Sequence, residues 1–180
     1  MLKFLLIFAI ISLIACILIL YIIYNYHSIE NVLYKINVCE NKINELLKNK
    51  TDLINRIVNI IERELKIEIK IFEEFKKINS NNLNNYDIDI LLDTTFDEVS
   101  RISEDHPSLS NVKSFDGLIN DINECNIILG GAKKMHSKYV AIYNKSIKKF
   151  PKKVIAKFKK LSMKSFYEIR EVEKEIESII

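Results

Sequence analysis

An uncharged apolar segment near the N-terminus constrains this chain most. Residues Phe4–Tyr24 read FLLIFAIISLIACILILYIIY and contain no Asp, Glu, Lys or Arg. As a helix, about 21 residues with a rise of about 1.5 Å each extend about 32 Å, which matches the hydrocarbon core of a bilayer. Tyr21, Tyr24 and Tyr26 lie at its far end, where aromatic side chains favour the membrane interface. The segment therefore predicts a single transmembrane helix over residues 4–24.

A cleaved signal peptide and lipidation at Cys16 are the two alternatives to a retained anchor. A signal peptide has a shorter apolar region that ends in a cleavage site of small residues, whereas this longer segment is followed by Tyr and Asn. Residues Leu13–Cys16 loosely fit a lipoprotein cleavage box, but cleavage there would leave a strongly apolar mature N-terminus. We therefore expect the anchor to be retained. The segment has no Gly, so pairing through a GxxxG motif has no support.

The lysines near the segment predict its orientation, because positive charge is enriched on the cytoplasmic side of a span. Only Lys3 precedes the segment, whereas Lys35, Lys42, Lys48 and Lys50 follow it. This distribution predicts a single-pass protein of the cell membrane with its C-terminal domain in the cytoplasm.

The composition of the chain favours helices. Its 180 residues include only three Gly and two Pro, which strand-rich folds need for their many turns. Hydrophobic residues make up 48% and charged residues 28%, which excludes a disordered chain. A net charge of only +3 argues against a nucleic-acid partner. Cys16, Cys39 and Cys125 show no CxxC spacing, so neither a disulfide framework nor a zinc site is predicted.

Apolar residues after the anchor recur every three or four positions, the spacing of amphipathic helices. The first stripe is interrupted by Glu40 and Lys50, and consists of Ile29, Leu33, Ile36, Ile43, Leu47, Ile54, Ile57, Ile61, Leu65, Ile69 and Phe72. Thr51-Asp52 is a candidate cap for a second helix, because Asp accepts hydrogen bonds from first-turn amides. Since no Gly or Pro forces a break, one helix over about residues 28–77 is the alternative.

Three further segments follow this stripe. The Asn-rich stretch Ile78–Asp87 predicts a loop, and the next helix carries an apolar face up to Ile102 and ends before Pro107. Another helix, capped by Ser108 or Ser110, extends to about residue 150. Helices joined by short loops pack antiparallel, so we expect an all-α fold: a transmembrane helix (4–24), an up-and-down antiparallel four-helix bundle (28–150) and an amphipathic helical tail (151–180). Without a turn at residues 51–52 the bundle has three helices.

Three stretches of the sequence resemble a known family. The segment DLINRIV (residues 52–58) is similar to the family pattern DLIPNLV, and HPSL (residues 106–109) is similar to YPDL. The third similarity is to the pattern TEN…AR..YN..V..YN..I..FP..IIA, over residues 124–156. In these three stretches the sequence resembles patterns of the LemA family of bacterial membrane proteins. The last pattern is matched by Glu124, Asn126, Ala132, Lys133, Val140, Tyr143, Asn144, Ile147, Phe150, Pro151, Ile155 and Ala156. Departures are Glu40 for a Trp, Asn55 for a Pro, and His136-Ser137 for the first YN. The resemblance implies a membrane-anchored four-helix bundle without established enzymatic activity, in some members linked to organising membranes or membrane complexes.

No catalytic, cofactor or metal site is predicted. A di-iron bundle needs Glu-x-x-His pairs, but none of His27, His106 and His136 has a Glu three residues before it. Gly130-Gly131-Ala132-Lys133 is the nearest approach to a phosphate loop, and its place within a helical pattern favours close helix packing at small residues instead. Tyr139 and Tyr143 are expected to be core residues.

A dense group of lysines is the strongest candidate for a functional surface. We call it the lysine block: Lys145, Lys148, Lys149, Lys152, Lys153, Lys157, Lys159, Lys160 and Lys164. Beyond it the sequence turns acidic, from Glu168 to Glu177. The simpler interpretation is a solvated helix face. The functional interpretation is contact with an anionic membrane surface, because a helix that returns toward the bilayer would bring the lysines to the headgroups.

These observations predict a membrane-anchored, non-enzymatic helical scaffold that organises or regulates other membrane proteins. Its expected partners are the lipid bilayer and an unidentified membrane protein, with no nucleic acid. One alternative is a coiled-coil-like homo-oligomer that shapes membranes. Another is an enzyme or ligand-binding bundle with an unrecognised site.

Overall fold

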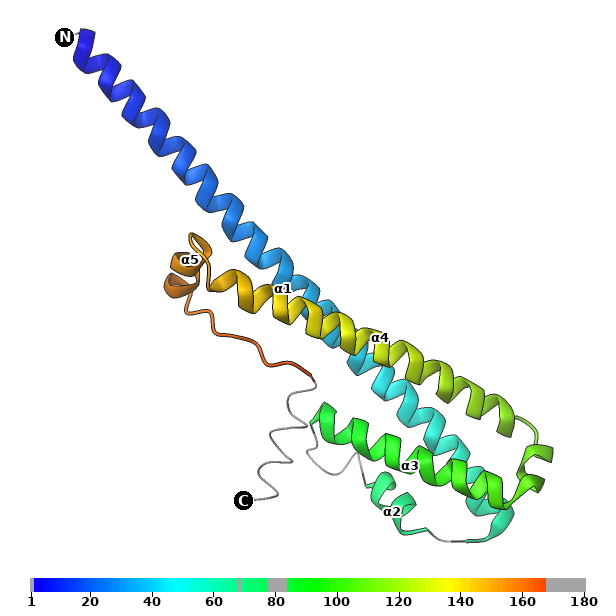
Figure 1. Cartoon of the computed structure of the whole chain (residues 1–180). Coiled ribbons are helices and arrows are strands. Elements are labelled where there is room, and N and C mark those ends of the chain that lie inside the picture. Colours follow the sequence, from blue (N-terminus) through cyan, green and yellow to red (C-terminus); the bar gives the residue numbers. More distant parts are fainter. Residues whose placement is uncertain (1, 68, 78–83, 168–180) are drawn as a thin grey trace, which may run out of the picture. The chain divides into compact units, whose positions relative to one another are not determined.

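The computed structural model describes residues 2–67, 69–77 and 84–167, and all regular structure within these ranges is helical (Figure 1). The elements in chain order are α1 (Leu2–Leu65), α2 (Lys70–Lys76), α3 (Asn85–Asp105), the 3-10 helix η1 (Pro107–Asn111), α4 (Phe115–Ile147) and α5 (Lys152–Phe158). The predicted all-α class and the long apolar N-terminal helix are confirmed.

Helix α1 is a single unbroken helix of 64 residues. Thr51 lies inside it and donates its hydroxyl to the backbone oxygen of Leu47 at 2.8 Å, so the predicted cap of a second helix at Thr51-Asp52 is wrong. A helical Thr can bond its own preceding turn in this way, which removes the need for a break. The alternative of one long helix is correct in kind, but α1 ends at Leu65 rather than near residue 77. Lys66 follows with φ 52°, a left-handed conformation that stops the helix.

The chain divides into two compact units, each described by itself. The second unit, residues 39–135, contains the C-terminal part of α1, the helices α2 and α3, and most of α4. In it Asn85 donates to Asn44, and Lys50 pairs with Asp93 further along both helices. The contact further along α1 is also the contact further along α3, so α1 and α3 run parallel. Residues 66–84 must therefore return the chain from the end of α1 to the start of α3, and α2 lies in this connection.

The ends of α3 and α4 follow from local chemistry. Asn84 caps α3 by accepting from the backbone amides of Tyr86 (3.0 Å) and Asp87 (3.1 Å), and α3 ends before Pro107 as predicted. Helix α4 begins at Phe115, after Ser114 with φ 75°, whereas the predicted caps Ser108 and Ser110 lie in η1. The 3-10 turn that Pro107 initiates occupies these positions, so the predicted start of α4 is too early.

Gly130 and Gly131 lie within α4, as their sequence context predicted. A Cβ atom added to either glycine would have no neighbour within 4 Å. The expected close packing of another helix against these two residues is therefore wrong, since close packing would place atoms in that space.

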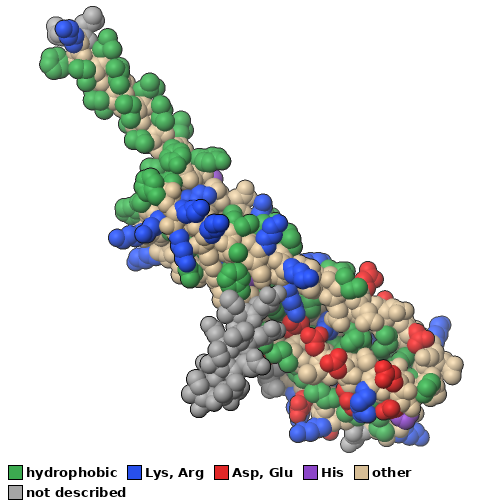
Figure 2. All heavy atoms as spheres, viewed as in Figure 1, with side chains coloured by type: hydrophobic (Ala, Val, Ile, Leu, Met, Phe, Trp, Pro, Cys, Tyr) green, Lys and Arg blue, Asp and Glu red, His purple; other side chains and the backbone are tan. Residues whose placement is uncertain are grey.

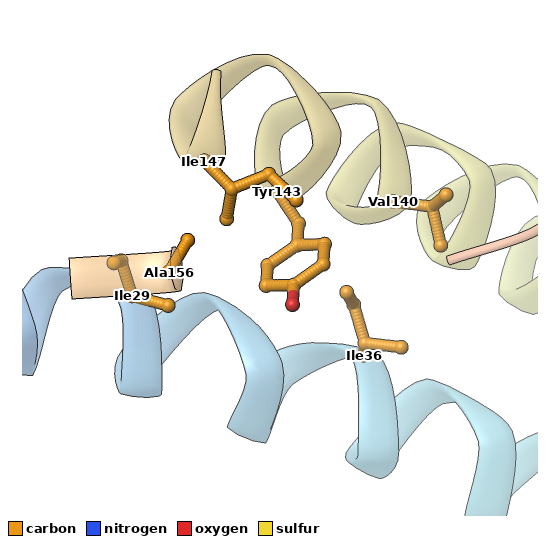
Figure 3. Close-up of a cluster of buried hydrophobic side chains, with 6 residues drawn as sticks. All are labelled: Ile29, Ile36, Val140, Tyr143, Ile147 and Ala156. Atoms are coloured by element: carbon orange, nitrogen blue, oxygen red, sulfur yellow. The ribbon is translucent and has the colours of Figure 1, made fainter. Parts of the chain in front are cut away.

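The first unit, residues 1–38 and 136–180, contains the N-terminal part of α1, the end of α4, and α5. Its core joins these three helices and consists of Ile29, Ile36, Val140, Tyr143, Ile147 and Ala156 (Figure 3). Tyr143 extends from α4 toward α1, which confirms it as a core residue. Burial in this core raises the pKa of the Tyr143 phenol above its usual value, because the charged form loses hydration.

Over the described part of the predicted helical tail, residues 151–167, the helix is present only as α5. The described residues beyond Phe158 contain no further helix, and Lys160 has φ 52°. Tyr143 donates to the backbone oxygen of Ser162 at 3.1 Å, and the side-chain amide of Asn144 bonds both the backbone oxygen (2.8 Å) and the amide (2.9 Å) of Lys164. These contacts satisfy backbone groups that a helix would otherwise pair, which explains the early end. The acidic stretch from Glu168 lies outside the described residues.

Candidate membrane-contact site

The apolar segment of α1 is exposed along its whole described length. No part of its most apolar window is buried, and the helix has the length and composition of a membrane span, as a signal sequence near an N-terminus also does. The same helix carries Ile29 and Ile36, which are fully buried in the core of the first unit. The segment is therefore compatible with a membrane anchor.

Helix α5 lies beside the end of this apolar segment. A pocket of about 350 Å³ is lined by apolar and aromatic side chains from both sides: Leu18, Tyr21 and Ile22 of α1, and Phe150, Pro151, Val154, Ile155 and Phe158 at α5. Phe158 is 85% exposed and Phe150 81% exposed, although both are large and apolar. Large exposed aromatic side chains beside a membrane-compatible helix are typical of an interfacial surface.

Two lysines hold α5 against α1. Lys152 donates its Nζ to the hydroxyl oxygen of Ser28 at 2.7 Å. The ammonium of Lys159 lies 5.1 Å from the ring centre of Tyr26, within the range of a cation–π interaction. Tyr26 donates its hydroxyl to the Glu30 carboxylate, and this hydrogen bond raises the pKa of the phenol because the phenolate would lie beside a negative charge.

The lysine block lies within the first unit. Lys145 lies in the last turn of α4, Lys148 and Lys149 follow that helix, and the others are on α5 or after it: Lys152, Lys153, Lys157, Lys159, Lys160 and Lys164. Lys153 and Lys157 line a second hollow of about 620 Å³ together with Val154 and Phe158. Figure 2 shows blue basic side chains gathered next to the green hydrophobic side chains of the N-terminal part of α1.

The charge of the first unit is strongly one-sided. Residues 1–38 and 136–167 contain twelve lysines and one acidic residue, Glu30. The whole chain has a net charge of only +3, so the excess of positive charge in this unit is offset by acidic residues elsewhere in the chain. The small net charge of the whole chain therefore does not show that positive charge is concentrated in the first unit.

The histidines do not form a site with other ligand-type residues. His136 is 5% exposed and its ring lies 6.3 Å from that of Tyr167, whereas His27 is exposed and lies 3.6 Å from Glu30. His106 is exposed at the C-terminal cap of α3. Among the described residues, no three His, Cys, Asp or Glu side chains are grouped so that they could hold a metal ion.

Two ion pairs in the second unit were not predicted. Lys50 of α1 is completely buried and pairs with Asp93, and Lys133 of α4 pairs with Asp89, which is also buried. Asp89 and Asp93 are one turn apart on α3, so a single helix supplies both carboxylates. The signal in the sequence was a lysine within an apolar stripe. Its partner lies 43 residues away, which no local pattern indicates.

The described residues thus define an all-α protein with a long apolar N-terminal helix and a lysine-rich unit around it. The model of the LemA family matches residues 40–179. The chain belongs to the LemA family, and the resemblance of its sequence motifs is confirmed. A comparison with curated proteins gives no match.

Proposed function

We propose that this LemA family protein is a membrane-anchored, non-enzymatic scaffold that organises or regulates other membrane proteins. The observation that carries the proposal is the continuity of α1, which is exposed and apolar over residues 4–24 and then enters the buried core at Ile29. A helix without a break between anchor and core leaves no flexible linker. The core of the first unit would therefore be held at a fixed distance from the bilayer, as a scaffold requires.

The second part of the proposal is that the lysine block contacts the anionic surface of the inner leaflet, with the C-terminal domain in the cytoplasm. Each lysine near such a surface contributes about 1 kcal/mol, and less as salt rises. Phe150 and Phe158 support this placement because both are largely exposed next to the end of the apolar segment. The second unit has more acidic than basic residues, so the same surface would repel it.

Although α1 has no break at residues 51–52, we also propose that residues 28–150 form an up-and-down four-helix arrangement, in which α2 takes the place of the second helix expected to begin at Thr51-Asp52. The parallel course of α1 and α3 supports it, since a returning element must lie between them in the chain. In the described residues that element is helical only over α2, so the second of the four helices is short.

Crosslinking in intact membranes followed by affinity purification in mild detergent tests the scaffold role. A reproducible crosslink to a different membrane protein is the expected result. A ladder containing this chain alone would favour the alternative of a membrane-shaping homo-oligomer, and a turnover activity that depends on a polar cluster of the bundle would favour an enzyme.

The orientation is tested with an impermeant thiol reagent on intact cells. Asn37→Cys places a thiol on the exposed side of α1, in a chain whose three native cysteines are replaced by Ser. This position is preferable to Cys39, because partial burial raises the pKa of the Cys39 thiol and slows its labelling. We expect labelling only after the cells are opened. Labelling from outside would reverse the proposed orientation.

A further inference from the structure

We propose that α5 and the end of the apolar segment of α1 together hold one anionic phospholipid. The proposal rests on the membrane placement proposed above, and it goes beyond a general attraction of lysines to a charged surface. It assigns a discrete site, with a pocket for an acyl chain and two lysines for the phosphate.

The acyl-chain half of the site is the pocket of about 350 Å³ between α1 and α5. Its volume lies at the lower end of the range of about 300–1,000 Å³ found for ligand pockets. Leu18 and Ile22 line it, about 9 Å and 3 Å before Tyr24 along the helix axis. At this depth acyl chains begin, so a lipid chain is the apolar group that the surroundings supply.

The headgroup half is the neighbouring hollow lined by Lys153 and Lys157. These lysines are four residues apart and therefore lie on the same side of α5. Val154 and Phe158 line both hollows, so the apolar pocket and the lysine pair share a border. A phospholipid carries its anionic phosphate and its apolar chains a few bonds apart, which matches this arrangement.

The lysines of α5 differ in what they contact. Lys152 bonds Ser28, and Lys159 just beyond the helix lies over Tyr26, so both attach α5 to α1. Within the part of the chain that the structure describes, Lys153 and Lys157 make no ion pair or side-chain hydrogen bond. The only acidic residue in the described part of the first unit, Glu30, accepts from Tyr26. Two ammonium groups without an acidic partner among the described residues, at the mouth of an apolar pocket, favour an anionic lipid over a neutral one.

Native mass spectrometry of the full chain tests the site directly. The protein is purified in mild detergent and incubated with equal amounts of phosphatidylglycerol and phosphatidylcholine that carry the same acyl chains. We expect a predominant complex with one phosphatidylglycerol, favoured over phosphatidylcholine by about thirtyfold, which corresponds to about 2 kcal/mol from the two lysines.

Two variants address the two halves of the site. Lys153→Gln with Lys157→Gln removes the phosphate contacts and should reduce retention of the lipid about thirtyfold. Val154→Trp fills the apolar pocket and should also cause a loss of retained lipid. Lys148→Gln with Lys149→Gln is the matched control, because it removes the same charge from the same block without touching either hollow. Circular dichroism of every variant checks that the helices are intact.

The outcomes separate this proposal from the membrane placement on which it rests. Three results would overturn the discrete site. The first is an equal loss of bound lipid in the Lys153/Lys157 variant and in the Lys148/Lys149 control. The others are equal retention of phosphatidylglycerol and phosphatidylcholine, and a dimer that carries no lipid. A Trp placed at Phe158 reports membrane contact independently, since bromine-labelled lipids quench it. Quenching without retained lipid means that α5 touches the membrane but holds no lipid there. Absence of quenching means that the membrane placement itself is wrong.

Discussion

The buried lysine of α1 provides a quantitative test of the packing in the second unit. The side chain of Lys50 is 0% exposed, whereas that of its partner Asp93 is 56% exposed. Asp93→Asn leaves the ammonium buried without its counter-charge. Breaking a fully buried pair costs about 3–5 kcal/mol, and an exposed pair is worth about 0–1 kcal/mol. Because only one partner is buried here, we expect a loss of about 2 kcal/mol in the free energy of unfolding.

For a chain of this size, about 2 kcal/mol corresponds to a decrease of about 4–8 °C in Tm. Thermal unfolding of the full chain in detergent, followed by circular dichroism, measures it. Lys50→Met replaces the buried charge with an apolar side chain of similar length, and it should change Tm little or raise it. In that background Asp93→Asn should have almost no effect. Asp97→Asn, one turn further along α3 at an exposed position, is the matched control.

The reasoning is refuted if Asp93→Asn lowers Tm equally with and without Lys50, because the loss would then not arise from the pair. It is equally refuted if Asp93→Asn leaves Tm unchanged while Lys50→Met lowers it by several degrees. That result would mean that the buried ammonium of Lys50 is stabilised by groups other than Asp93.

Three further predictions concern the helices, the anchor and metal dependence. Gly130→Ala and Gly131→Ala should each stabilise the protein by about 0.5–1 kcal/mol in thermal unfolding, because the space for a Cβ is open and Ala favours the helix; a lower Tm in both would show that the space is occupied. Intact mass of the membrane protein should correspond to an uncleaved apolar segment, and a mature N-terminus at a lipid-modified Cys16 would contradict this. Chelator treatment should leave Tm and helical circular dichroism unchanged, whereas a large decrease in Tm would reveal a metal site.

Much of the helical core was predictable because the apolar stripe of α1 is a local signal. Ile29, Ile36, Ile54 and Ile61 are all buried as the three-and-four spacing indicated. The break at Thr51-Asp52 was not correctly predicted, since a Thr hydroxyl caps a helix or bonds its own preceding turn with the same chemistry. Which of the two occurs depends on packing on both sides of the residue.

The C-terminal segment shows where sequence periodicity is insufficient. Leu161 and Phe166 follow helical spacing after α5, yet the described residues there are not helical. Asn144, some 20 residues earlier on α4, bonds the backbone of Lys164 and so competes with helix formation. A tertiary contact therefore overrides a local preference.

The candidate site was predictable in its charge and not in its shape. The lysine block is continuous in sequence, and its density around Phe150 indicated a surface of one sign. The pocket between α5 and α1 brings Leu18 together with Phe158, which are 140 positions apart in the chain. Only the fold places them together, so no spacing rule could have found the pocket.

The depth of Phe158 in the membrane tests the central claim most directly. The chain contains no Trp, so Phe158→Trp gives the full protein one fluorescent reporter. Reconstituted into vesicles with bromine-labelled anionic lipids, it should be strongly quenched, with the greatest effect from labels near the headgroup end of the acyl chains. Val38→Trp, exposed on α1 about 21 Å beyond Tyr24, should be quenched little. Equal, weak quenching of both reporters would contradict a membrane-contacting α5.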